Sequence, residues 1–225
     1  MDFKTTLIAS CSVTMALAPG AVGADHAERG GCLGFSDLSM VLERNDTDGD
    51  TEVVAFAKGQ DDGLAKLAIR APNGRKVFGY RGDRRGIGMR EFALESAEPP
   101  ELALVLESFP QGEYNFEGKT VSEDCLQGVA ALSHELAPTS EGDIVLRDHV
   151  TVEWAAVPQA LVYLIEVKNE ETDNALLVQV PAPSTSFAVP AAWLTPDTEH
   201  QVAVGVRTST GNLTNVESFF FTASE

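Results

Sequence analysis

The stretch Leu194-Thr-Pro-Asp-Thr-Glu-His-Gln-Val-Ala-Val-Gly-Val206 says most about the fold of this chain. In its second half Val202, Val204 and Val206 alternate with smaller or polar residues, which is the pattern of a half-buried strand. Turn-forming residues separate this strand from its neighbours at the spacing of a β-sandwich. Further strands are predicted at Val150–Trp154, Tyr163–Val167, Leu176–Val180, Ser186–Val189 and Val216–Phe221.

Over residues 138–225 the chain resembles the fibronectin type III family. The resemblance rests on Trp154 at the end of the second strand, Tyr163 at the start of the third, and the run Leu194-x-Pro196-x-Thr198-x-His200. It implies a β-sandwich, in which the last position of that run is usually the tyrosine of a corner hydrogen bond. His200 stands there instead, and an imidazole is shorter than a phenol and can take a charge.

The region before residue 138 is also predicted to be β-rich. Pro72-Asn73-Gly74-Arg75 separates two apolar runs and predicts a hairpin. Apolar residues at helical spacing after Pro99-Pro100 predict one short helix that ends before Pro110. Glu95 to Gly118 resembles a β-rich module of uncharacterised bacterial secreted proteins, a resemblance that implies no activity.

The linker is placed at Leu136–Asp143, where Pro, Gly and small polar residues gather. The predicted fold class is therefore all-β: a C-terminal fibronectin type III-like β-sandwich preceded by a β-rich domain with one short helix. The predicted organisation is a signal peptide at residues 1–24, an N-terminal domain at 25–137 and the sandwich domain at 138–225.

The first 24 residues have the layout of a secretory signal peptide. Lys4 precedes an uncharged apolar stretch, and Val22 and Ala24 occupy the −3 and −1 positions of a cleavage site. A lipoprotein anchor at Cys11 is disfavoured, because too few apolar residues precede it. No later segment has the roughly 18 apolar residues that a membrane span needs. We therefore expect a secreted or periplasmic protein without a transmembrane segment.

Export leaves Cys32 and Cys125 as a pair in an oxidising compartment, and we expect a disulfide between them. Such a bond would close a loop of 125 − 32 = 93 residues. Loop entropy then predicts a stabilisation of about 4–5 kcal/mol. Two buried free thiols are the alternative.

The formal net charge of −18, from 16 basic and 34 acidic residues, argues against nucleic acid and anionic lipid as partners. Within this acidic chain, residues 70–90 hold seven bases and one acid, Asp83. The segment could dock an anionic glycan or an acidic protein face, including a second copy of the chain. Alternatively, it is a solvated hairpin whose bases balance nearby acids. The candidate contacts are Arg75, Lys76, Arg81, Arg84 and Arg85.

The turn from Asn45 to Glu52 carries carboxylates at Asp46, Asp48 and Asp50, which resembles the first half of an EF-hand loop and suggests Ca²⁺. Its second half departs from that pattern, since Thr51 replaces the glycine and Ala57 the bidentate acid. A polar turn between strands accounts for the same residues.

No histidine spacing typical of a metal enzyme and no nucleophile elbow are present in the sequence, so no catalytic residue and no cofactor are assigned. The leading hypothesis is a non-catalytic binding or structural module of the envelope or extracellular space, with a protein or glycan partner. Two alternatives stay open: a calcium-binding extracellular protein that uses the acidic turn, and a hydrolase of unrecognised type.

Overall fold

The computed structural model describes residues 31–83, 85–99, 101–140, 145–147, 150–172 and 174–223. The predicted signal peptide, Cys11 and Arg84 lie outside these residues. Fifteen strands and two short helices are described: β1 (Leu33–Gly34), β2 (Asp37–Asn45), β3 (Thr51–Lys58), β4 (Leu64–Arg70), β5 (Lys76–Arg81), β6 (Glu91–Glu95), α1 (Leu102–Ser108), β7 (Gly112–Thr120), β8 (Cys125–Leu132), β9 (Val145–Arg147), β10 (Thr151–Glu153), β11 (Val162–Asn169), β12 (Ala175–Pro181), β13 (Ser186–Ala188), the 3₁₀-helix η1 (Ala191–Trp193), β14 (Glu199–Arg207) and β15 (Leu213–Phe221).

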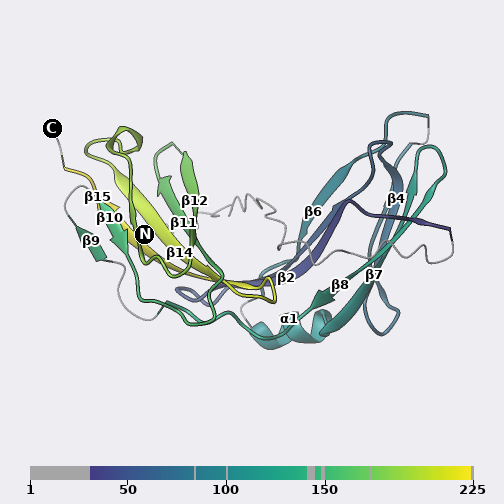
Figure 1. Ribbon diagram of the computed structural model, residues 1–225, viewed down its shortest axis with the longest axis horizontal. Coiled ribbons are helices and arrows are strands. Elements are labelled where there is room, and N and C mark those ends of the chain that lie inside the picture. The colour runs from purple at the N-terminus through teal and green to yellow at the C-terminus, as the bar shows by residue number, and fades with distance from the viewer. Residues whose placement is uncertain are drawn as a thin grey trace, which may run out of the picture.

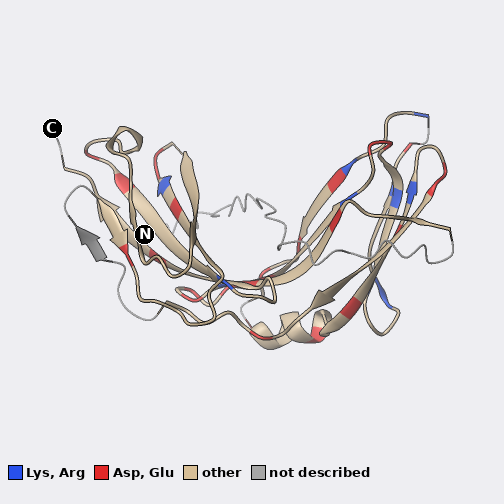
Figure 2. Ribbon diagram, viewed as in Figure 1, with Lys and Arg blue, Asp and Glu red and all other residues tan. Residues whose placement is uncertain are grey.

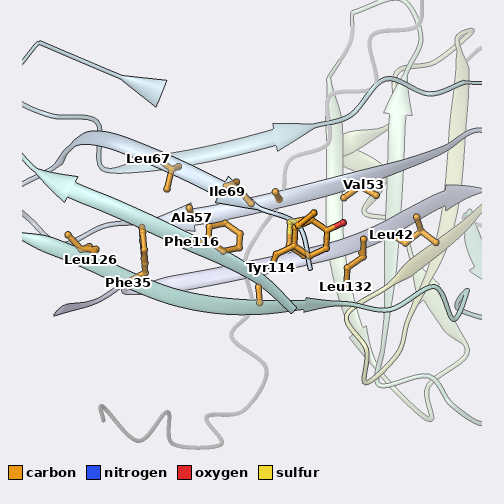
Figure 3. Close-up of a cluster of buried hydrophobic side chains, with 14 of the residues drawn as sticks. Phe35, Leu42, Val53, Ala57, Leu67, Ile69, Tyr114, Phe116, Leu126 and Leu132 are labelled. Carbon is orange, nitrogen blue, oxygen red and sulfur yellow. The ribbon is translucent and has the colours of Figure 1, made fainter. Parts of the chain in front are cut away.

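The first sandwich packs a five-stranded sheet, in the order β1-β8-β7-β4-β5, against strands β2, β3 and β6. Alternate residues of these strands point inward, because successive side chains of a strand lie on opposite faces. Tyr114 and Phe116 of β7 are fully buried there, and Phe35 meets Phe116 edge to face at 6.2 Å between ring centroids. Figure 3 shows these side chains gathered between the two layers.

The second sandwich has its own apolar core between the sheet β13-β10-β9 and strands β12, β11, β14 and β15. The three valines that alternate along β14 are all fully buried in this core, as their period of two predicts. Trp154 packs on Tyr163 with ring centroids 5.3 Å apart, and the hydroxyl of Tyr163 accepts a 2.8 Å hydrogen bond from the Val157 N–H.

One seven-stranded sheet, in the order β12-β11-β14-β15-β2-β3-β6, runs through both sandwiches. The two halves join where β15 pairs in parallel with β2, at Leu213 with Glu43, Thr214 with Arg44 and Asn215 with Asn45. Figure 1 shows the two sandwiches side by side, with β2 passing from one to the other. The sandwiches therefore share backbone hydrogen bonds as well as a connecting segment.

Asn212, which is fully buried, fastens this junction. Its Oδ1 accepts a hydrogen bond from the Leu42 N–H at 2.8 Å, and its Nδ2 donates to the carbonyls of Ser133 at 3.0 Å and Glu135 at 2.6 Å. Beside it the Thr214 hydroxyl donates to the Ala137 carbonyl at 2.7 Å. All the capacity of the Asn212 amide except one acceptor site is thus used to join the first sandwich to the second.

The local predictions for the first sandwich are confirmed. The hairpin is β4–β5, and Gly74 in its turn has a φ of 81°, which glycine adopts without strain. The predicted helix is α1, which buries Val105 in the first core. Strand β6 was not predicted, although Phe92 and Leu94 pack against that core and the alternate residues Glu91, Ala93 and Glu95 are exposed.

The predicted disulfide is present. Cys32 and Cys125 are bonded, with their Cα atoms 4.9 Å apart. The bond ties the chain beside β1 to the first residue of β8, next to the parallel pairing of those two strands. Among the described residues, no helix is long and apolar enough to cross a membrane.

Candidate binding surface

The outer face of the five-stranded sheet carries a row of cations. Arg81 of β5 stands directly opposite Lys66 of β4, and Lys66 stands directly opposite Lys119 of β7. Neighbouring strands lie about 4.8 Å apart, so the row extends over roughly 10 Å across the sheet. Figure 2 shows that Lys and Arg concentrate on this sandwich, whereas Asp and Glu are spread over both.

A shallow hollow of about 480 Å³ lies beside this row, and Arg81, Lys66 and Lys119 are among its lining residues. Gly79 and Ala68, which pair across β5 and β4, also line it and leave room because their side chains are small or absent. Lys76 reaches over the same spot, since a Cβ added to Gly79 would lie 3.2 Å from the Lys76 Nζ. Four cations therefore surround one hollow.

The five basic residues singled out in the sequence do not form a single cluster. Lys76 and Arg81 line the hollow, whereas Arg75 lies in the hairpin turn and donates to the Ser108 carbonyl at the end of α1. Arg85 bonds to Asp83 within its own loop, and Arg84 is outside the described residues. The cluster instead includes Lys66 and Lys119, which sequence reasoning missed.

The loop after β5 has a fixed base and an exposed tip. Leu64 and Met89 exchange backbone hydrogen bonds of 2.7 and 3.1 Å at the base. Gly63 and Gly88 touch there so closely that a Cβ on either would lie within 2.7 Å of the other's backbone. At the tip Ile87 is 98% exposed. At the other end of the loop, the Gly82 N–H donates to the Ala65 carbonyl at 2.8 Å and fixes the end of β5, next to Arg81, beside the hollow.

The acidic turn between β2 and β3 is held together by its own polar groups. The Asn45 side chain accepts the Thr47 N–H at 3.0 Å, and the Asp48 carboxylate accepts the Asp50 N–H, also at 3.0 Å. The Asp46 carboxylate pairs with Arg44 at 3.0 Å. Within the part of the chain that the structure describes, no three His, Cys, Asp or Glu side chains are grouped as metal ligands. The calcium alternative stays a prediction, which calorimetric titration of the full chain with Ca²⁺ would test.

Several carboxylates meet where this turn joins the seven-stranded sheet. Glu43 of β2 stands directly opposite Glu52 of β3. Burial, with a smaller contribution from the nearby carboxylates of Glu95, Glu98 and Glu43, raises the pKa of Glu52 to about 8. Burial also raises the pKa of Glu43, and the guanidinium of Arg207 partly opposes this shift. The cluster favours a protonated carboxyl near neutral pH.

His200 takes the place of the corner tyrosine. The ring is fully buried, and it stacks on Phe220 at 5.3 Å between centroids. Its Nε2 lies 3.5 Å from the Thr195 N–H, and its Nδ1 lies 3.1 Å from the Thr198 carbonyl. Both contacts are satisfied if Nδ1 carries the proton and Nε2 accepts. The imidazole therefore keeps the corner hydrogen bond, at the longer distance of 3.5 Å to the Thr195 N–H, and adds a second hydrogen bond to the Thr198 carbonyl.

The second sandwich has two antiparallel layers over a core, with Trp154 and Tyr163 in contact at its centre. This architecture is the one that fibronectin type III domains share with immunoglobulin domains. The second sandwich is fibronectin type III-like. The prediction drawn from Trp154, Tyr163 and the Leu194–His200 run is thereby confirmed, with His200 filling its corner.

Two solved structures with fibronectin type III domains are similar to most of the chain. One is a two-domain segment of chicken tenascin, with 13% sequence identity and a TM-score of 0.36, covering 84% of this chain and 99% of the other. The second is the FN1–FN3 segment of chicken CNTN1, with 13% identity and a TM-score of 0.34, covering 86% of this chain and 66% of the other. No protein-family model matches the chain, and no curated protein matches it.

Proposed function

We propose that this chain is an exported, non-catalytic binding or structural module of the cell envelope or extracellular space. The fibronectin type III-like sandwich and the disulfide both support the proposal, because disulfides persist in oxidising compartments. The observation that carries it is the gathering of four cations around one exposed hollow of an otherwise acidic protein. A surface of opposite sign to the rest of a molecule is typical of a contact site.

The junction between the sandwiches supports the same role. Because β15 and β2 pair and the Asn212 side chain makes three hydrogen bonds to the first sandwich, the first sandwich is held in a fixed relation to the second. A module of this kind presents the hollow on a rigid support, so little conformational entropy is lost when a partner binds.

A pull-down from the producer's own envelope tests the proposal. The full chain is immobilised, and a variant with Lys66→Glu and Arg81→Glu serves as the matched control. We expect the wild type to retain a macromolecule that the variant releases. Retention of only a small metabolite, or the same yield from both baits, would contradict the proposal.

A further inference from the structure

The cation row is costly for a structure that only needs to fold. Like charges directly opposite each other on neighbouring strands destabilise a sheet, and the row contains two such pairs in succession. Lys119 is offset by Glu123 at 3.0 Å, but Arg81 makes no ion pair or side-chain hydrogen bond with any described residue. Lys66 also has an interaction partner, so the row is compensated in part, yet it keeps three bases of a chain with 34 acids side by side on one face.

The hollow is shaped to receive a ligand from above the sheet. Gly79 and Ala68 keep its floor low, and the Lys76 ammonium lies over that floor rather than outside it. One carboxylate, that of Glu117, lines the hollow, and it pairs with Arg70 at 3.5 Å. A ligand would therefore meet cations on several sides, and the two carboxylates beside them, those of Glu117 and Glu123, are each paired with a base.

The two inner strands of the cation row offer no free backbone edge to a peptide. Strands β4 and β7, which supply Lys66, Ala68 and Lys119, lie inside the sheet and are paired on both sides. A bound peptide gains much of its affinity from main-chain hydrogen bonds at a sheet edge. Strand β5 is the outer strand of this sheet, but the cation row runs across the strands on the face of the sheet rather than along that edge. A ligand that contacts all three cations is therefore recognised by side chains, which favours a ligand that carries its own regular array of anionic groups.

We propose that this hollow binds a linear acidic polysaccharide, which crosses strands β5, β4 and β7 with its anionic groups over Arg81, Lys66 and Lys119. The inference rests on the proposed function and names its ligand class. The closely spaced anions of such a chain match a row of cations set about 4.8 Å apart. The Arg81 guanidinium contributes paired hydrogen bonds to one anion, and the lysines act as point charges.

The overall negative charge of the protein does not oppose this contact at physiological salt. Charges more than about 8 Å away are largely screened there. Within that distance the ligand meets the four cations of the hollow, the lining carboxylate of Glu117 and the carboxylate of Glu123, which lies 3.0 Å from the Lys119 Nζ. Affinity should consequently fall as ionic strength rises, because the contacts at the exposed hollow are themselves partly screened.

Titration of the full chain with alginate oligosaccharides, which are linear and carry a carboxylate on each sugar, tests the inference. We expect Lys66→Gln with Arg81→Gln to weaken binding roughly tenfold or more, which corresponds to the loss of charge-assisted contacts. Lys58→Gln with Arg85→Gln removes the same charge outside the hollow and should change affinity by less than about twofold. A third variant, Gly79→Val, leaves the net charge unchanged but fills the hollow and displaces the Lys76 ammonium above it, so it should also abolish binding.

Three outcomes would overturn the inference: equal weakening by the two charge variants, unchanged binding by Gly79→Val, or no binding of alginate to the wild type. If polyglutamate of equal charge binds as tightly as alginate, the ligand is an acidic protein rather than a polysaccharide, and the inference is overturned. Neutral dextran should not bind. If alginate fails while the envelope pull-down still yields a partner, the inference falls and the proposed function stands. If alginate does not bind and the pull-down yields no partner, both the inference and the proposed function are contradicted.

Discussion

At the scale of single residues, the Cys32–Cys125 bond is a large contributor to stability. It joins two residues that are 93 positions apart in the sequence, so it considerably restricts the conformations of the unfolded chain. Its position beside the β1–β8 pairing also anchors a strand of only two residues.

Replacing both cysteines by alanine should lower the free energy of unfolding by about 2–5 kcal/mol. Denaturant unfolding of the variant and of the wild type, with and without reductant, measures the change. Reduction should bring the wild type to the midpoint of the variant and leave the variant where it is. If the disulfide of the wild type is shown to be reduced and its unfolding midpoint does not change, the expectation is contradicted.

His200 stabilises the corner of the second sandwich through two hydrogen bonds and a stacked ring. The variant His200→Ala removes a fully buried ring and leaves the Thr195 N–H without its acceptor. We expect a loss of about 2–4 kcal/mol, from the cavity and the unpaired donor together. Thermal and urea unfolding measure this loss of stability, and Glu199→Ala, at the exposed position next to His200, is the control. A loss no greater than that of the control would show that the corner does not depend on the imidazole.

At the scale of elements, the facing acids of β2 and β3 give the protein a pH dependence. The pKa of Glu52, at about 8, lies above the ordinary 4.5 because of burial and the neighbouring carboxylates. A folded-state pKa above the unfolded value means that the folded state binds the proton more tightly. The contribution of this carboxyl to stability is therefore fully present below about pH 4.5 and is lost as pH rises to about 8.

The variant Glu52→Gln should not lose this stability as the pH rises, because glutamine does not titrate. Relative to wild type it should gain stability between about pH 5 and 8, by at most roughly 1.4 kcal/mol per pH unit, and gain no more above that window. Urea unfolding across the pH range measures the difference, and Glu113→Gln on an exposed position of β7 is the control. A constant difference at every pH would contradict the assignment.

Elements defined by neighbouring residues could be predicted from the sequence, and elements defined by distant ones could not. Asn73-Gly74 marks a turn by its own backbone preference, so the β4–β5 hairpin was predicted. Strand β6 has the inward alternation of Phe92 and Leu94, but its five residues are too few to separate a strand from a helix start. The row from Arg81 to Lys119 depends on the register of three strands, and that register is set by packing across the sheet.

At the scale of the whole molecule, the seven-stranded sheet couples the two sandwiches. The pairing of β15 with β2 joins residues about 170 positions apart, as the Leu42–Asn212 bond shows. No local pattern could have predicted this contact, since only the folded arrangement brings the two strands together. The resemblance to fibronectin type III domains likewise indicated the second sandwich but not its junction with the first.

We expect the two sandwiches of the wild type to unfold together. Both tryptophans, Trp154 and Trp193, belong to the second sandwich, so their fluorescence reports on it alone, while far-ultraviolet circular dichroism reports on both. The two urea curves should coincide in the wild type.

In Asn212→Ala, which leaves three backbone groups without partners, the two curves should separate, and stability should fall by about 2–5 kcal/mol. The exposed position Asn115→Ala is the control, and separate curves in the wild type would show that the sandwiches are independent.

The parallel pairing of β2 with β15 also has a mechanical consequence. A pull on the amino end of β2 and the carboxyl end of β15 drags two parallel strands past each other, so the hydrogen bonds of their pairing bear the load simultaneously rather than opening one by one. The register from Glu43 to Asn45 and the Asn212 side chain lie in the line of that load. Tension along the chain would thus meet resistance at the junction of the two sandwiches before either core is opened.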